Sequence, residues 1–210
     1  MPTVFFDLDG TLIDSRADLA TAVNLMRRDL GLPSIPTAVV AGYVGEGLRL
    51  LVQRALAERP QALDDAVART REYYRAHLLD RTVLYPGVSE ALRRIGEGGW
   101  KCAVVTNKPR EFALPILTGL GISDFIETVV GGGDAIALKP SPAPVFLAAR
   151  QLGLADLCGS WMAGDAFTDL EAGRRAGVHC CFCRYGFGDP RDEPYSLAVD
   201  SPLELARRLL

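Results

Sequence analysis

The stretch VFFDLDGTLIDS, residues 4–15, runs from three apolar residues directly into two carboxylates, Asp7 and Asp9. An apolar run of this kind is typical of a strand that is buried on both faces of a parallel sheet. Taken alone, the two acids are also compatible with a turn followed by a helix cap. Their role therefore depends on the architecture that surrounds the strand.

Short runs of β-forming residues alternate with helical segments along most of the chain. Residues 86–99 predict a helix, because apolar residues recur at helical spacing after a proline and stop at two glycines. Residues 141–153 carry the same signals. This alternation is typical of βαβ units and predicts an α/β fold with a parallel sheet covered on both faces. The predicted strands cover residues 3–7, 101–106, 127–131, 160–165 and 178–183.

Residues 14–84 interrupt the alternation, because nothing there has the pattern of a further strand. One crossover between parallel strands needs only a dozen or so residues. We therefore predict an inserted all-helical cap domain over residues 15–85, with an α/β core formed by residues 1–14 and 86–210. The two connections between cap and core are expected to lie close together. Amphipathic patterns place the cap helices at residues 15–32, 46–58 and 64–79.

The composition is ordinary for a compact protein with a substantial core: 210 residues, 49% hydrophobic and 23% charged, with a formal net charge of −3. No lysine- or arginine-rich run is present, which argues against nucleic-acid binding. The N-terminus has no secretory pattern, and no apolar stretch approaches the roughly 18 residues of a membrane span. The expected location is the cytoplasm, without a membrane partner and as a monomer or homodimer.

Three of the five cysteines, Cys180, Cys181 and Cys183, lie together in the apolar run HCCFC. A metal site is one interpretation, but the spacing is not that of a zinc ribbon and no second cluster completes it. The favoured interpretation is a buried parallel strand in which cysteine packs as a small hydrophobic residue. Disulfides are not expected in a reducing compartment.

Polar side chains follow the predicted strands, at the sheet edge where ligands of open parallel sheets bind. Four carboxylates gathered there would repel one another strongly, and a divalent cation would relieve that repulsion. Mg²⁺ suits a site made only of oxygen ligands, and a lysine adds positive charge for an anionic substrate. The residues are Asp7 and Asp9 after the first strand, Thr106 and Asn107 after the second, Lys139 before a helix, and Asp165 and Asp169 after a later strand.

This set of residues resembles the signature of the haloacid-dehalogenase-like superfamily. DLDGT, the Thr-Asn pair, the lone lysine before a helix and the pattern GD…D occur in the family's order and span nearly the whole chain. The resemblance implies a doubly wound, Rossmann-like core with a helical cap inserted after the first motif. That is where the all-helical stretch is predicted independently.

The resemblance also implies the catalytic roles. In phosphatases of this superfamily the first aspartate, here Asp7, is the nucleophile that forms an aspartyl-phosphate. The second, here Asp9, protonates the leaving oxygen and then activates water. An aspartate at this second position argues against the dehalogenase and cation-pumping ATPase branches. Thr106 and Lys139 are expected to hold the phosphoryl oxygens.

For the metal, the resemblance implies Mg²⁺ held by Asp7, Asp165 and the backbone carbonyl of Asp9. Asp169 is expected either to bind the ion or to support its ligands. Many relatives carry serine or threonine after the GD pair, whereas this chain has Ala166. This departure removes a hydroxyl near the metal but no carboxylate.

Five further residues are expected to contact the substrate. Gly10 is expected to let the phosphate approach the backbone closely, and Asn107 to lie beside the phosphoryl group. The cap stretch AGYVGEGLRLL, residues 41–51, resembles a Gly-x-Gly loop of the phosphoglycolate phosphatase branch, as do TNKP, GGGD and KPSPAP. In that loop Gly45, Glu46 and Arg49 are candidates, with Arg49 as the partner of a carboxylate or, alternatively, a solvated helix residue.

The leading hypothesis is a Mg²⁺-dependent phosphatase for a small phosphorylated metabolite, most plausibly 2-phosphoglycolate. Another small substrate is the nearest alternative: pyrophosphate, a sugar phosphate or an amino-sugar phosphate. A mutase resembling β-phosphoglucomutase would return the phosphoryl group to a second hydroxyl. A binding module that kept the fold without catalysis is a third alternative, and the complete set of acids argues against it.

Overall fold

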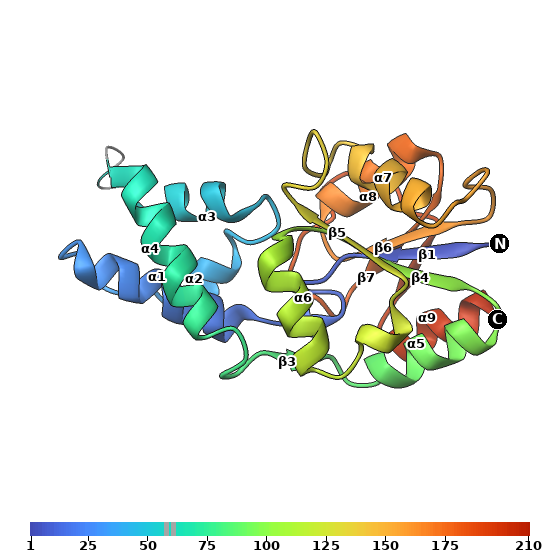
Figure 1. The fold of residues 1–210 in the computed structure, drawn as a ribbon, viewed down its shortest axis with the longest axis horizontal. Coiled ribbons are helices and arrows are strands. Elements are labelled where there is room, and N and C mark those ends of the chain that lie inside the picture. Colours follow the sequence, from blue (N-terminus) through green and yellow to red (C-terminus); the bar gives the residue numbers. More distant parts are fainter. Residues whose placement is uncertain (57–58, 60–61) are drawn as a thin grey trace.

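A computed structural model describes residues 1–56, 59 and 62–210 of the chain. The core is built on a sheet of six parallel strands, and the predicted α/β architecture is confirmed (Figure 1). Across the sheet the strands lie in the order β5 (Thr128–Gly132), β4 (Lys101–Pro109), β1 (Thr3–Phe6), β6 (Trp161–Gly164), β7 (His179–Cys183) and β8 (Leu197–Val199).

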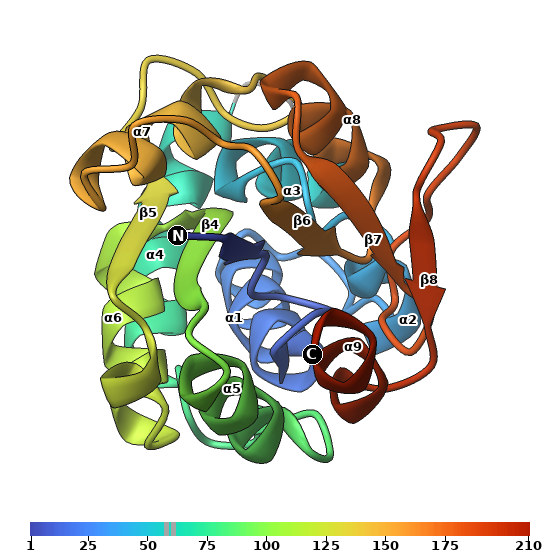
Figure 2. The same ribbon diagram turned by 90° about the vertical axis from the view of Figure 1, so that its right-hand side faces the viewer.

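Helices cover both faces of the sheet, so every residue of its central strand β1 is buried (Figure 2). The helices of the core are α5 (Val88–Glu97), α6 (Arg110–Gly119), α7 (Ala143–Gln151), α8 (Phe167–Ala176) and α9 (Pro202–Leu209). In β1, Val4 and Phe6 pack into the hydrophobic cluster under α5 and α9. Phe5 points the other way, into the cluster under α7 and α8.

All five predicted strands are present, and the described residues add three short ones. β8 lies at the edge of the sheet beside β7, and its three residues are too few to produce a recognisable pattern. β2 (Ile13–Asp14) and β3 (Val83–Leu84) pair with each other and lie at the two ends of the stretch that was expected to be all-helical. The five cysteines are free, and the three in β7 are buried as expected.

The described helices of the cap lie beside the sheet in Figure 1. They pack around their own hydrophobic cluster, which includes Val23, Met26, Leu51 and Tyr74. Residues 57 and 58 of the helix expected over 46–58 lie outside the described residues. The cap helices are α1 (Arg16–Asp29), α2 (Thr37–Ala41), α3 (Leu48–Ala55) and α4 (Leu63–Ala76).

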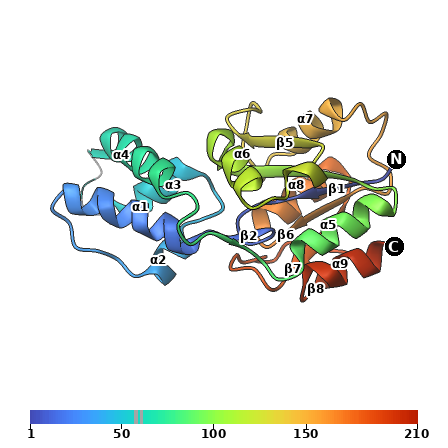
Figure 3. The ribbon, with the colours of Figure 1, turned by 60° about the horizontal axis from the view of Figure 1, so that its bottom comes forward.

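The two connections between cap and core run side by side, as expected (Figure 3). The strands β2 and β3 pair antiparallel there, and a buried carboxylate reinforces the pairing. Asp18 Oδ2 accepts hydrogen bonds from the backbone N–H groups of Arg81 (2.9 Å) and Thr82 (2.7 Å) and from the Thr82 hydroxyl (2.8 Å). The start of α1 is therefore tied to the second connection. In the described part of the chain no helix is long and apolar enough to cross a membrane.

Candidate active site

The carboxyl ends of β1 and β6 bring together three buried acids, Asp7, Asp165 and Asp169. One carboxylate oxygen from each lies within 4.8 Å of the others. Strands β1 and β6 are hydrogen-bonded neighbours, so their ends meet at the same edge of the sheet. Asp169 reaches this edge from the first turn of α8, where its Oδ2 accepts the N–H of Ala166 (3.0 Å). The structure therefore brings together three of the four carboxylates that were expected to gather.

Lys139 lies in the middle of this cluster. Its Nζ is 2.7 Å from Asp7 Oδ1, 2.7 Å from Asp169 Oδ1 and 2.6 Å from the carbonyl oxygen of Val105. Burial by itself would lower the pKa of Lys139, but the Asp169 and Asp7 carboxylates outweigh burial and raise the pKa. The ammonium group is therefore charged and held rigidly beside the oxygens of Asp7.

The cluster remains short of positive charge. Burial is the main reason why the pKa of Asp7 is raised to about 6, although the positive charge of Lys139 lowers it. Burial also raises the pKa of Asp165 well above its ordinary value, and the negative charges of Asp169 and Asp7 add to the effect. A further cation beside these buried carboxylates would favour their ionised forms.

Asp165 is oriented by backbone rather than by side chains. Its Oδ2 accepts hydrogen bonds from the backbone N–H groups of Phe187 (2.9 Å) and Gly188 (2.7 Å), and neither of these bonds involves Oδ1. The Asp165 carboxylate has room here because residue 10 is a glycine. A Cβ on Gly10 would lie 1.9 Å from Asp165 Oδ2, and the φ angle of Gly10 is +88°. The Gly10 N–H donates to Ile13. Gly10 was expected to admit the phosphate; in the structure the group that approaches it is the Asp165 carboxylate.

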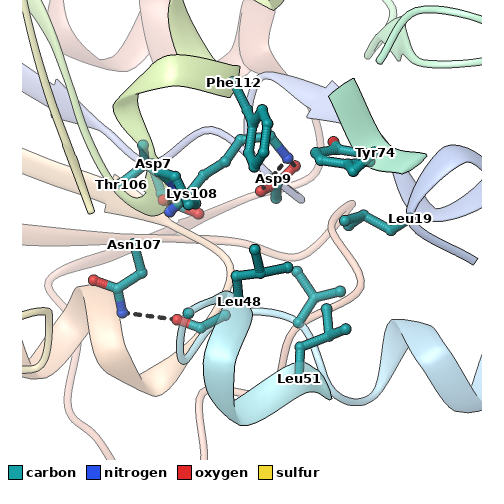
Figure 4. Close-up of a pocket in the computed structure, with 14 residues that line it drawn as sticks. Asp7, Asp9, Leu19, Leu48, Leu51, Tyr74, Thr106, Asn107, Lys108 and Phe112 are labelled. Atoms are coloured by element: carbon teal, nitrogen blue, oxygen red, sulfur yellow. Dashed lines mark hydrogen bonds and ion pairs between the residues drawn. The ribbon is translucent and has the colours of Figure 1, made fainter. Parts of the chain in front are cut away.

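The second aspartate of the signature faces the cap and has its own cation (Figure 4). Lys108 Nζ lies 2.9 and 3.0 Å from the two carboxylate oxygens of Asp9, and the Ser15 hydroxyl also donates to Asp9. The carboxylate of Asp9 is not one of the three that form the metal-type cluster. Counting Lys108 with Lys139, four carboxylates face two ammonium groups, and a divalent cation would balance the remaining charge of −2.

A pocket lies between the cap and the core, directly over Asp7 and Asp9 (Figure 4). Its wall is largely apolar on the cap side and polar on the core side. Thr106 is part of the polar side, and its hydroxyl accepts the N–H of Lys108 (3.2 Å). The lining residues are Asp7, Asp9, Leu19, Val44, Gly45, Gly47, Leu48, Leu51, Tyr74, Thr106, Asn107, Lys108, Pro109 and Phe112.

Asn107 joins the pocket wall to the cap instead of presenting free donors. Its Nδ2 donates to the carbonyl oxygens of Gly45 (2.8 Å) and Lys139 (2.9 Å), and its Oδ1 accepts the N–H of Lys139 (2.8 Å). Both N–H bonds of the amide are therefore used. A phosphate contact was expected here, but the geometry makes Asn107 a positioning residue for the Lys139 backbone and the cap loop.

The three cap candidates are placed differently. Gly45 lines the pocket through its backbone. Glu46 is not among the residues that line the pocket, and it pairs with Arg54 at 2.6 Å. Arg49 projects from α3 with 63% of its side chain exposed and pairs with Asp64, so its guanidinium does not reach the pocket. The alternative interpretation of Arg49, a solvated helix residue, is the one that the structure matches.

Sequence reasoning missed Lys108, Ser15 and Tyr74 at this site. A signal for Lys108 was available, because only three of the 23 basic residues are lysines: Lys101, Lys108 and Lys139. A chain that uses arginine almost everywhere else places two of its three lysines in one buried site. Tyr74 and Ser15 carry no such signal, since their approach to Asp9 depends on how the cap docks.

The chain is similar in sequence to known enzymes over most of its length. A sequence profile of the family described as "Haloacid dehalogenase-like hydrolase" matches residues 4–183. The "Phosphoglycolate phosphatase, plasmid" of Cupriavidus necator is 37% identical over 202 residues, which cover 94% of this chain and 87% of that protein. The phosphoglycolate phosphatase of Chromobacterium violaceum is 37% identical over 210 residues, covering 96% and 93%.

A solved structure extends the similarity to three dimensions. The crystal structure of a predicted phosphoglycolate phosphatase from Haemophilus somnus matches with a TM-score of 0.92 and 29% identity, covering 100% of this chain and 98% of that one. The chain belongs to the haloacid dehalogenase-like hydrolases. Within that family, both relatives named above are phosphoglycolate phosphatases.

Proposed function

We propose that the protein is a Mg²⁺-dependent phosphatase that hydrolyses small phosphomonoesters, with 2-phosphoglycolate as the preferred substrate. The observation that carries the proposal is Asp7, a carboxylate held 2.7 Å from a buried ammonium group and within reach of two further acids. The similarity to the phosphoglycolate phosphatases of Cupriavidus necator and Chromobacterium violaceum supports the choice of substrate.

The residues present fit a magnesium ion. The cluster offers only oxygen ligands, which Mg²⁺ prefers. Asp7 Oδ2 and Asp165 Oδ1 are the oxygens to which no hydrogen bond is assigned in the described residues, whereas both oxygens of Asp169 accept one. Asp7 and Asp165 would hold the ion with the Asp9 carbonyl, and Asp169 would support them through Lys139. Bound there, the ion would supply charge neutralisation for a phosphoryl group.

The reaction proceeds in two displacements at phosphorus. A carboxylate oxygen of Asp7 attacks phosphorus, the bond from phosphorus to the ester oxygen breaks, and Asp9 donates a proton to the leaving alkoxide. Asp9, now ionised, takes a proton from water, which attacks the aspartyl-phosphate and releases inorganic phosphate and free Asp7. Lys139 and the Thr106 hydroxyl stabilise the negative charge on the phosphoryl oxygens.

Closure of the cap limits the size of the substrate. The pocket over Asp7 has a cavity volume of about 40 Å³ in the structure, which corresponds to room for roughly three waters. A cavity of this size favours a small metabolite, and a folded phosphoprotein would not fit under the cap. Closure also excludes bulk water, which strengthens the interactions of the charged groups inside.

Hydrolysis in ¹⁸O-labelled water tests the proposal against a phosphosugar mutase. We expect label in released phosphate, formation of glycolate from 2-phosphoglycolate, and complete dependence on Mg²⁺. The Asp7→Asn variant should retain the fold and lose at least about 10⁴-fold in kcat, while Asp9→Asn should slow both steps. Isomerised sugar phosphate without free phosphate would instead establish a mutase, and no turnover of any phosphomonoester would favour a binding module.

A further inference from the structure

The pocket over Asp7 and Asp9 contains one cation among its lining residues, Lys108. Its side chain is 3% exposed, and it comes from the end of β4 in the core. The other cation of the site, Lys139, is held between Asp7 and Asp169 below the pocket. A substrate with an anionic leaving group therefore meets Lys108 first. This inference rests on the proposed function and concerns the part of the substrate beyond its ester oxygen.

The position of Lys108 matches a carboxylate next to the ester carbon. Its Nζ lies 2.9 Å from Asp9, the residue that protonates the leaving oxygen. In a phosphorylated 2-hydroxy acid, the carboxylate is bonded to the carbon that carries the ester oxygen. Ordinary bond lengths then place a carboxylate oxygen about 3 Å from the ester oxygen. An ammonium group that is one hydrogen bond from the proton donor can reach such a carboxylate without moving far.

A second polar group points to the same place. The Tyr74 hydroxyl is buried, lines the pocket close to Lys108 and Ser15, and makes no hydrogen bond of ordinary geometry among the described residues. A buried hydroxyl without a partner is costly unless a ligand satisfies it. The ring of Tyr74 lies 4.6 Å from Lys108 Nζ, so the cap-side hydroxyl and the core-side ammonium are neighbours (Figure 4). Burial raises the pKa of Tyr74 to about 12, which keeps the hydroxyl a donor.

The rest of the cap-side wall is apolar. Leu19, Leu48 and Leu51 of the cap offer no side-chain hydrogen-bonding groups, and neither does Phe112 of the core helix α6. The hydroxyls of a sugar phosphate would lose their water there without gaining partners, and an enzyme site discriminates strongly against such groups. A two-carbon acid needs partners only at its carboxylate.

We propose that Lys108 and Tyr74 bind the carboxylate of the substrate and make the enzyme selective for phosphoesters of short 2-hydroxy acids. Lys108 takes the role that the sequence suggested for Arg49. When the substrate binds, the ammonium group contacts both the substrate carboxylate and Asp9. In the structure the ammonium group pairs with Asp9 and lies over the ring of Tyr74.

The test compares 2-phosphoglycolate with 2-phosphoglycolamide, its neutral isosteric amide. The ratio of their kcat/KM values measures recognition of the charge and is insensitive to general loss of catalysis. Wild-type protein should prefer the acid by about 30- to 100-fold, the range typical of a buried charge-assisted hydrogen bond. Lys108→Met should reduce the preference to within about threefold, Lys108→Arg should keep most of it, and Tyr74→Phe should reduce it by about fivefold.

Lys101→Met is the matched control, because the third lysine pairs with Glu127 outside the pocket. It should leave the ratio unchanged. If Lys108→Met lowers kcat/KM equally for the acid and the amide, then Lys108 acts only through Asp9 and the inference is overturned. A wild-type ratio near one would also overturn it without any variant, while phosphatase activity would still stand. If wild-type protein hydrolyses neither compound nor any other phosphomonoester, the proposed function itself fails.

Discussion

Asn107 is predicted to connect substrate enclosure with the placement of Lys139, and Asn107→Leu tests this directly. Leucine has a similar volume and keeps the apolar contacts, but it removes three hydrogen bonds of 2.8, 2.9 and 2.8 Å. Two of these bonds fix the Lys139 backbone, and the third holds the cap loop through the Gly45 carbonyl. The substitution therefore loosens the cation beside Asp7 and the cap in one step.

The magnitude of the effect can be worked out from the buried bonds. Each contributes about 1 kcal/mol net, so the variant should lose about 3 kcal/mol of stability. For a chain of this size that corresponds to a fall in Tm of about 6–12 °C. A displacement of Lys139 by about 1 Å should cost a further factor of about 10² in kcat/KM at a temperature where the variant is folded.

Asn24→Leu is the matched control. Asn24 makes the same reciprocal pair of hydrogen bonds, with the backbone of Ile35 (3.0 and 2.9 Å), but within the cap and away from the pocket. Asn24→Leu should have a lower Tm than wild type, measured by differential scanning calorimetry. Its kcat/KM at 25 °C should stay within about twofold of wild type. If Asn107→Leu lowers Tm and also leaves kcat/KM unchanged, then Asn107 is only structural and the reasoning is refuted.

Two further predictions concern the acid cluster. Gly10→Ala should abolish activity and lower Tm, because the new methyl group would displace the Asp165 carboxylate and strain a φ of +88°; wild-type kcat would contradict this. Because the pKa of Asp7 in the folded protein, about 6, lies above its ordinary 3.8, Asp7 stabilises the metal-free fold below about pH 4. That contribution, about 3 kcal/mol, is lost as the pH rises through 6. The rise in Tm caused by Mg²⁺ should therefore be larger at pH 7.5 than at pH 5, and equal rises measured against a chelator control would disprove it.

Local patterns in the sequence were enough to predict the architecture and the acids of the site. Apolar strands followed by polar residues at their carboxyl ends predict a parallel sheet with a site at one edge. The structure gathers Asp7, Asp165 and Asp169 at this edge, while Asp9 pairs with Lys108. The physical reason is that periodicity and burial are local properties of the chain. A strand buried on both faces must be apolar throughout, so a charged side chain of the site can come only where the strand ends.

Contacts across the fold settled what surrounds those acids. Whether Arg49 or Lys108 supplies the cation of the pocket depends on how the cap docks, which no local pattern encodes. The surroundings of Gly10 and Asn107 were likewise set by distant residues, Asp165 in one case and Gly45 with Lys139 in the other. Such contacts could not be predicted, because the energy of a buried hydrogen bond or ion pair depends on partners that folding alone brings together.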